Sequence, residues 1–136
     1  MTARDQRGLA LSVWTSVSLP AFILMVGLGV DFAGHAAAEQ EARAVASQAA
    51  RAATHELRVT STGATLDVAA AKREAVSFAR AAGFAAEARI EGGNVARVTV
   101  RGAYDTLFLG LIGVNSIGVE VAGSARAVTT VDGAEA

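Results

Sequence analysis

The sequence predicts an α+β protein in which a long N-terminal helix leads into a small head, made of one helix on a roughly three-stranded antiparallel sheet. Three observations support this prediction: an uncharged run from Gly8 to Val30, an alanine-rich segment without proline at 32–59, and a two-residue periodicity after residue 85. The expected parts are a tip at 1–8, a long helix at 9–59 with a transmembrane half at 9–30, a head at 66–131 and a tail at 132–136.

The composition excludes several classes of function. Of the 136 residues, those outside the uncharged run suffice for one small domain. A net charge of −1 provides no basic field for nucleic acid, and the lack of cysteine excludes disulfides and thiolate metal sites. His35 and His55 lack the spacing of a zinc pair, and Glu39 and Glu41 point to different helix faces. We therefore expect a protein that is not an enzyme, with no catalytic residues, metal or cofactor.

The uncharged run is long enough to cross a membrane. Its 23 residues form about 34 Å of helix, and the hydrocarbon core of a bilayer is about 30 Å thick. Arg4 and Arg7 precede the run, and the next basic residue is Arg43, so the positive-inside rule places the N-terminus in the cytoplasm and the head outside. The competing interpretation is a secretory signal cleaved after Ala38, although the run is longer than a usual signal core.

Several residues in and beside this run are candidates for helix assembly. Pro20 predicts a kink, because it removes one backbone donor. Small residues such as Ser16, Gly27 and Gly29 allow close packing against another helix, or they are ordinary residues of a membrane helix. Asp31 either marks the membrane edge and bonds to water, or sets the register of an assembly beside a neighbour's basic group or N-terminus.

The second half of the long helix is expected to carry a narrow apolar stripe. Small side chains recur there at steps of three and four residues: Ala38, Ala42, Val45, Ala49, Ala53 and Leu57. An alanine stripe permits close approach, either to this protein's own head or to several neighbouring helices.

The head is expected to begin after a polar break at 60–65. A second helix is predicted at 66–82, with Thr65 or Asp67 as its cap and Gly83 as its stop. Its buried face comprises Val68, Ala71, Ala75, Phe78, Ala79 and Ala82. Strands are predicted at 86–90, 95–104 and about 118–131, because apolar and polar residues alternate there.

An apolar run at 107–112 separates the last two predicted strands. Its sequence, Leu-Phe-Leu-Gly-Leu-Ile, is unusually hydrophobic for so small a head. It either belongs to the core, docks a neighbour or touches the bilayer.

The chain resembles the TadE/TadG-like minor pilins or pseudopilins of tight-adherence (Flp, type IV-like) pilus systems. The residues that carry the resemblance are Gln6-Arg7-Gly8, Leu19-Pro20, Val26-Gly27-Leu28-Gly29-Val30-Asp31 and Arg51-Ala52-Ala53, followed by Val98-Thr99-Val100, Gly110-Leu-Ile-Gly113 and Ala122-Gly-Ser-Ala-Arg-Ala127. The resemblance implies a pilin-like subunit of the bacterial cytoplasmic membrane. Such a subunit helps to assemble or initiate a pilus with other pilin subunits and an assembly platform, and can enter the extracellular filament.

The resemblance also implies a possible prepilin peptidase site after Gly8, which would leave Leu9 as the first residue. The fifth mature position is then Val13, where many family members have glutamate. This departure leaves open whether the chain is trimmed or stays uncut as an anchor. The alternative functions are a membrane-anchored binding module of the cell envelope and a secreted soluble domain released at Ala38.

Overall fold

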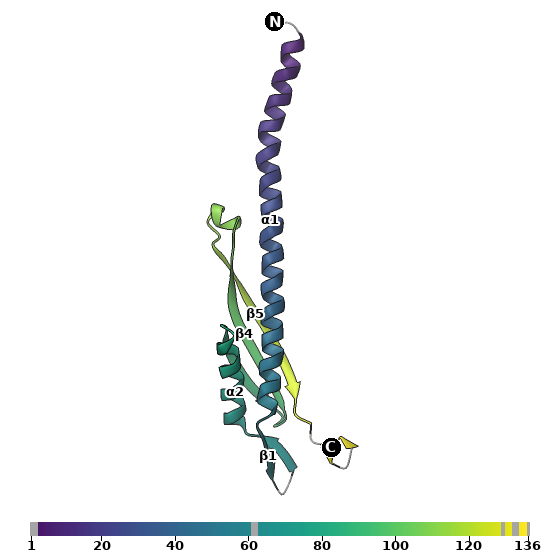
Figure 1. Cartoon of the computed structure of the whole chain (residues 1–136), viewed down its shortest axis with the longest axis vertical. Coiled ribbons are helices and arrows are strands. Elements are labelled where there is room, and N and C mark those ends of the chain that lie inside the picture. Colours follow the sequence, from purple (N-terminus) through teal and green to yellow (C-terminus); the bar gives the residue numbers. More distant parts are fainter. Residues whose placement is uncertain (1–2, 61–62, 129, 132–133, 136) are drawn as a thin grey trace.

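A single long helix forms the axis of the molecule. The computed structural model describes residues 3–60, 63–128, 130–131 and 134–135, with side chains described for 10–56 and 66–128. Helix α1 runs from Ala3–Thr54, and the head packs along little more than its C-terminal half (Figure 1). It ends before residue 59 because the chain turns into a hairpin of β1 (Leu57–Thr60) and β2 (Gly63–Leu66). The hairpin thus occupies part of the polar break predicted at 60–65. Ser61 and Thr62 lie outside the described residues.

Helix α1 continues through Pro20. In the turn before the proline, the Thr15 hydroxyl donates to the Leu11 carbonyl at 2.9 Å and the Ser16 hydroxyl donates to the Ser12 carbonyl at 2.8 Å. Hydroxyl bonds of this kind are common where a membrane helix tolerates proline. The predicted kink stays a prediction, since the helix is assigned without a break on both sides of Pro20.

The second helix begins at the predicted cap. Helix α2 spans Val68–Ala81, and the Asp67 carboxylate accepts hydrogen bonds from the backbone N–H groups of Ala69 and Ala70. Gly83, with φ of +85°, follows the helix in the left-handed region that glycine adopts without strain. The face of α2 that the sequence predicts to be buried is buried in its centre, whereas Val68 and Ala82 at its two ends are exposed.

The head contains the expected three-stranded antiparallel sheet. Its order is β3 (Ala85–Glu91), β4 (Val95–Asp105) and β5 (Ser116–Arg126). A short 3-10 helix, η1 (Leu109–Ile112), lies between β4 and β5. The last strand ends at Arg126, earlier than predicted, and β6 (Thr130–Val131) pairs with β7 (Ala134–Glu135) in a separate hairpin.

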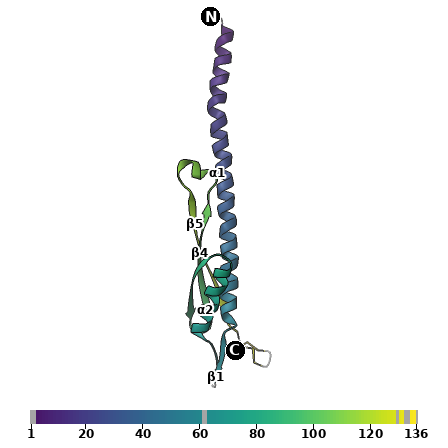
Figure 2. The ribbon, with the colours of Figure 1, turned by 60° about the vertical axis from the view of Figure 1, so that its left-hand side comes forward.

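Both helices cover one face of this sheet, as Figures 1 and 2 show from two directions. The shared core consists almost wholly of small side chains: Ala42, Ala46, Ala49, Ala50, Ala53, Ala71, Ala75, Ala79, Ala88, Ala96, Val98, Val100, Val119 and Val121. At Gly123 the sheet approaches the backbone of α1 itself, because an added Cβ would overlap the backbone of Ala46 and Ser47. The alanine stripe of α1 therefore packs against the protein's own head. Leu57, its predicted last member, belongs to β1 instead.

The other face of the sheet is charged and open to solvent. It carries three ion pairs, Arg89–Glu87, Arg97–Glu91 and Arg101–Glu120, all with exposed side chains. The Arg101 side-chain hydrogen bond and charge lower the pKa of Glu120, and the same interaction raises the pKa of Arg101. Exposed pairs of this kind contribute little to stability.

Candidate functional site

The β4–β5 loop, residues 106–115, lies beside α1 at the point where the apolar half of the helix begins. In Figures 1 and 2 it is the end of the β4–β5 hairpin that reaches farthest toward the N-terminus of α1. Asp31 is the first charged residue after the uncharged run, and its side chain is 0% exposed. The loop is what buries it.

The Asp31 carboxylate binds the loop through its backbone. One oxygen accepts the Leu107 N–H at 2.7 Å, and the other accepts the N–H groups of Phe108 at 2.9 Å and Leu109 at 2.6 Å. These donors include the start of η1, where N–H groups lack partners within the helix. Asp31 therefore caps the short helix from a different element, and neither water nor a neighbouring chain is needed to explain its burial.

The hydrogen bonds keep Asp31 ionised. Burial alone raises the pKa of this carboxyl, but the three backbone donors and the Tyr104 hydroxyl lower it by more, so the pKa lies below its ordinary value of 3.8. The carboxylate is consequently charged at neutral pH and acts as a fixed acceptor rather than as a proton carrier.

Two glycines of α1 let the loop and its strand approach the helix. A Cβ at Gly27 would overlap the Phe108 ring, and a Cβ at Gly34 would overlap the Tyr104 ring. The Tyr104 ring also meets His35 edge to face, with 6.5 Å between centroids. Gly27, Asp31 and Gly34 follow one another at steps of four and three, so they share one helix face. The stripe predicted from Ala38 onward thus extends back into the apolar half, and this spacing is the signal that could have revealed the contact.

The loop satisfies much of its own backbone as well. The Thr106 N–H donates to the Asn115 carbonyl at 3.0 Å and closes the neck of the loop. Within the loop, Leu111 N–H donates to Phe108 at 3.1 Å, Gly113 N–H to Gly110 at 3.1 Å, and Val114 N–H to Leu109 at 3.0 Å. The Thr106 hydroxyl donates to the Val114 carbonyl. The loop is therefore a compact, internally bonded unit.

Apolar side chains nevertheless cover the outside of the loop. Leu107 is 66% exposed, Leu111 78% and Ile112 70%. Of the three alternatives for this run, the one that places it in the core is therefore wrong for these three residues. An apolar groove of about 370 Å³ lies between loop and helix, lined by Leu24, Met25, Leu28, Phe108, Leu109 and Ile112.

The predicted assembly residues fall into two groups. Gly27 and Asp31 are buried against the loop, so they are used within the chain. Val13, Ser16, Pro20 and Gly29 are exposed on the part of α1 that the head leaves uncovered, and an added Cβ at Gly29 would meet nothing within 4 Å. Gly8 and Leu9 belong to α1 near its start, and their side chains lie outside the described ones.

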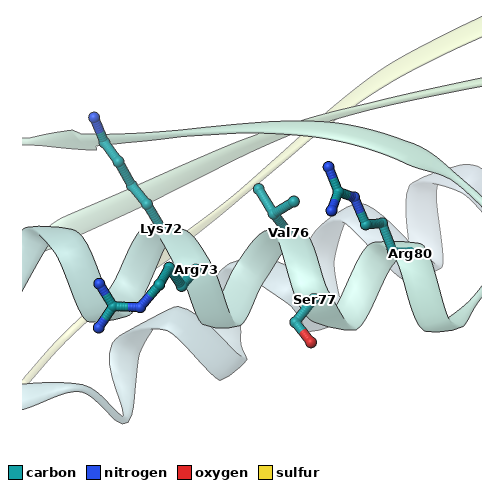
Figure 3. A pocket seen from close by; sticks show the side chains of 5 residues that line it. All are labelled: Lys72, Arg73, Val76, Ser77 and Arg80. Atoms are coloured by element: carbon teal, nitrogen blue, oxygen red, sulfur yellow. The ribbon is translucent and has the colours of Figure 1, made fainter.

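A second hollow on α2 is lined by basic side chains. Figure 3 shows Lys72, Val76 and Arg80 extending to one side of the helix, and Arg73 and Ser77 to the other. The basic groups are exposed and diverge, so they do not converge on a common ligand position. Among the residues that the structure describes, no group of three or more His, Asp or Glu side chains is placed to hold a metal ion.

Comparisons of this chain with protein-family models, with curated proteins and with solved structures find no match. A functional conclusion therefore depends on the residues and geometry of the chain itself. By length and composition, α1 contains one segment that is apolar enough to cross a membrane.

Proposed function

We propose that this chain is a non-enzymatic, single-span minor pilin- or pseudopilin-like subunit that takes part in assembling or initiating a Tad/Flp-type pilus through α1. The observation that carries the proposal is the division of one continuous helix into a covered half and a bare half. The bare half comprises residues 8–30 of α1 outside the face that the loop covers, and this run is uncharged, as lateral association inside a bilayer requires. Along the covered half, the head packs on the same continuous helix.

The side chains of the bare half support this proposal by their exposure. Leu11 is 70% exposed and Val17 68%, and large apolar neighbours are exposed around the whole helix: Trp14, Leu19, Phe22, Ile23, Leu24 and Met25. A helix that is apolar all round needs lipid or other helices around it. Ser16, Pro20 and Gly29 are available for packing against another subunit.

The contacts of the covered half favour an anchored chain over a released domain. Cleavage after Ala38 would remove Gly27, Asp31 and Gly34, and with them every contact described above between the β4–β5 loop and α1. The three N–H donors of the loop would then lose their carboxylate acceptor, which is costly for a structured turn. The head is thus built to keep the helix.

The proposed orientation places the N-terminus in the bacterial cytoplasm and the head outside, because Arg4 and Arg7 precede the run. The intact mass of the protein extracted from membranes tests processing. A species that begins at Leu9 supports trimming by a prepilin peptidase after Gly8. A full-length species supports an uncut anchor, and one that begins at Glu39 contradicts both membrane-bound forms.

Cysteine cross-linking in native membranes tests assembly, and the absence of natural cysteine makes each introduced thiol unique. Val13→Cys and Ser16→Cys lie on the bare half, whereas Glu41→Cys, exposed beside the covered half, is the matched control. We expect oxidation to form a disulfide between the first two variants and a second copy, or a pilin-type subunit that carries an introduced cysteine of its own, and to leave the control monomeric.

The same experiment separates assembly from the alternative of a tethered binding module. A module that uses α1 only as an anchor would stay monomeric at every position along the bare half. It would also fail to copurify with a pilus assembly platform. That pair of results would overturn the proposed function while leaving the membrane span intact.

A further inference from the structure

We propose that the β4–β5 loop is a second membrane-contacting element, which inserts into the outer leaflet beside α1 and places Leu107, Leu111 and Ile112 among the lipid acyl chains. This inference goes beyond the proposed function. It requires that α1 crosses a bilayer, and it holds whether or not the chain joins a pilus.

The depth of the loop follows from its partners on α1. Asp31 binds the loop backbone, and loop side chains line a common groove with the helix as far back as Leu24. Seven residues of helix separate these two positions, which corresponds to about 10 Å. If residues 9–30 fill the hydrocarbon core, the loop lies beside the last 10 Å or so of it, close to the depth of about 5–10 Å that interfacial elements occupy.

The composition of the loop matches that environment. No charged residue occurs from Thr106 to Asn115, and charges return only on the strands, at Asp105 and Glu120. The most exposed of the loop's large apolar side chains are leucine and isoleucine. A soluble head would gain nothing from presenting these groups to water.

The hydrogen bonding of the loop lowers the main obstacle to insertion. Irregular backbone is excluded from lipid because unpaired N–H and C=O groups are costly there. Here Asp31 accepts three loop N–H groups, and turn and 3-10 bonds use those of Thr106, Leu111, Gly113 and Val114. The carboxylate thus makes an otherwise polar turn compatible with an apolar surrounding.

The occupant of this surface is identified by its continuity with α1. The apolar groove joins loop side chains to Leu24, Met25 and Leu28 of the helix. These helix residues belong to the run that would face acyl chains, so the same lipid would cover the loop beside them. A second copy of the chain, as the alternative occupant, would have to cover both the groove and the bare half of α1.

Depth-dependent quenching tests the proposal with the full chain in phosphatidylcholine–phosphatidylglycerol nanodiscs. A polarity-sensitive fluorophore is attached to Leu111→Cys, to Val17→Cys as the marker of the span, and to Ser124→Cys as an exposed head control. Ser124 lies eight residues along β5 from Ser116, which is roughly 26 Å from the loop end. Nitroxides carried by the lipids, both near the headgroup and deep along the acyl chain, and iodide in the water serve as quenchers.

We expect nitroxide lipids to quench the label at position 111 and iodide to spare it, with the reverse at position 124. Equal iodide quenching at positions 111 and 124 would overturn the proposal, because the loop would then lie in water. Protection at 111 from both quenchers would also overturn it, in favour of a protein partner. Loss of lipid quenching at position 17 would show instead that α1 does not span the bilayer, and the inference would fall with it.

Discussion

The two halves of α1 bury their surfaces in different ways. Along the covered half, Ala42, Ala46 and Ala49 are fully buried although each has the smallest side chain that an L-residue offers. Along the bare half, Trp14, Phe22 and Met25 are more than half exposed. Small residues occur where the backbone of α1 must approach the head closely, and large ones occur where the head leaves the helix uncovered. The size of the side chain thus distinguishes the covered from the uncovered part of the same helix.

Gly123→Leu should break the covered half most severely. Any side chain at this position overlaps the backbone of α1, which cannot rotate away as a side chain can. We expect a destabilisation of at least about 3 kcal/mol or failure of the head to fold, measured by thermal denaturation in detergent micelles. Gly118→Ala on the same strand is the control, because an added Cβ there meets nothing within 4 Å. Similar midpoints for both variants would contradict the packing described.

Gly27→Leu and Gly29→Leu sharpen the boundary between the halves. The first displaces the Phe108 ring and should cost about 1–3 kcal/mol of overpacking strain, because the loop must move off the helix. The second should leave the head unchanged and affect only contacts with other helices. Near-ultraviolet circular dichroism and denaturation midpoints measure the first effect, and cross-linking or pilus formation measures the second. A loop undisturbed by Gly27→Leu would mean that the glycine is not required for close approach.

Asp31→Asn should loosen the loop without unfolding the core. The amide keeps an acceptor oxygen but places an NH2 group where the second carboxylate oxygen accepts two N–H groups. We expect hydrogen exchange at Leu107, Phe108 and Leu109 to accelerate roughly tenfold or more, while exchange in β3 stays unchanged. Asp105→Asn, at an exposed position just before the loop, controls for the loss of one negative charge. Equal acceleration in both variants would refute a specific role for Asp31.

Acid should release the same contact in the native chain. Because the pKa of Asp31 is lower in the folded state than its ordinary value of 3.8, ionisation stabilises the contact above that value, and the stabilisation is lost as pH falls below it. A label at Leu111→Cys should therefore report loop release only at pH values below 3.8. Glu87 and Glu120 also have lowered pKa values, because they form hydrogen bonds with Arg89 and Arg101. The stability of the whole fold should therefore also decrease as the pH falls. The combination with Asp31→Asn isolates the local change, which should disappear in that variant.

Arg101→Gln should have the smallest effect. The Arg101–Glu120 pair is more than half exposed on the open face of the sheet, where water and salt screen it. We expect no measurable change in the denaturation midpoint at physiological ionic strength. A large loss would show that the open face is covered by something in the native assembly.

Local patterns predicted most of the fold. The alanine stripe, the Asp67 cap and the inward alternation of Ala96, Val98 and Val100 depend on residues close together in sequence, and all are confirmed. The sequence pattern does not predict the hairpin at 57–66, because Leu57 fits the helical stripe. Long-range bonds hold that hairpin, including Asp67 N–H to the Glu56 carbonyl and Leu66 N–H to the Gly93 carbonyl.

The loop contact could be predicted only in part. The sequence singles out Asp31 and the apolar run at 107–112 separately, but the two are 76 to 78 residues apart when they meet. The shared face of Gly27, Asp31 and Gly34 indicates that another segment approaches the helix closely there. A buried carboxylate first suggests a basic side chain as its partner, whereas here the partner is the backbone of a distant turn.

The uninterrupted course of α1 has a mechanical consequence. Because the helix joins the apolar run to the head without a hinge, and Asp31 ties the β4–β5 loop to the same helix, a force that pulls the head outward acts on helix and loop together. If α1 spans a bilayer and the loop inserts beside it as proposed, extraction would expose Leu107, Leu111 and Ile112 at the same moment as the last turns of the span. Under that proposal, the loop adds to the work of withdrawal at its start.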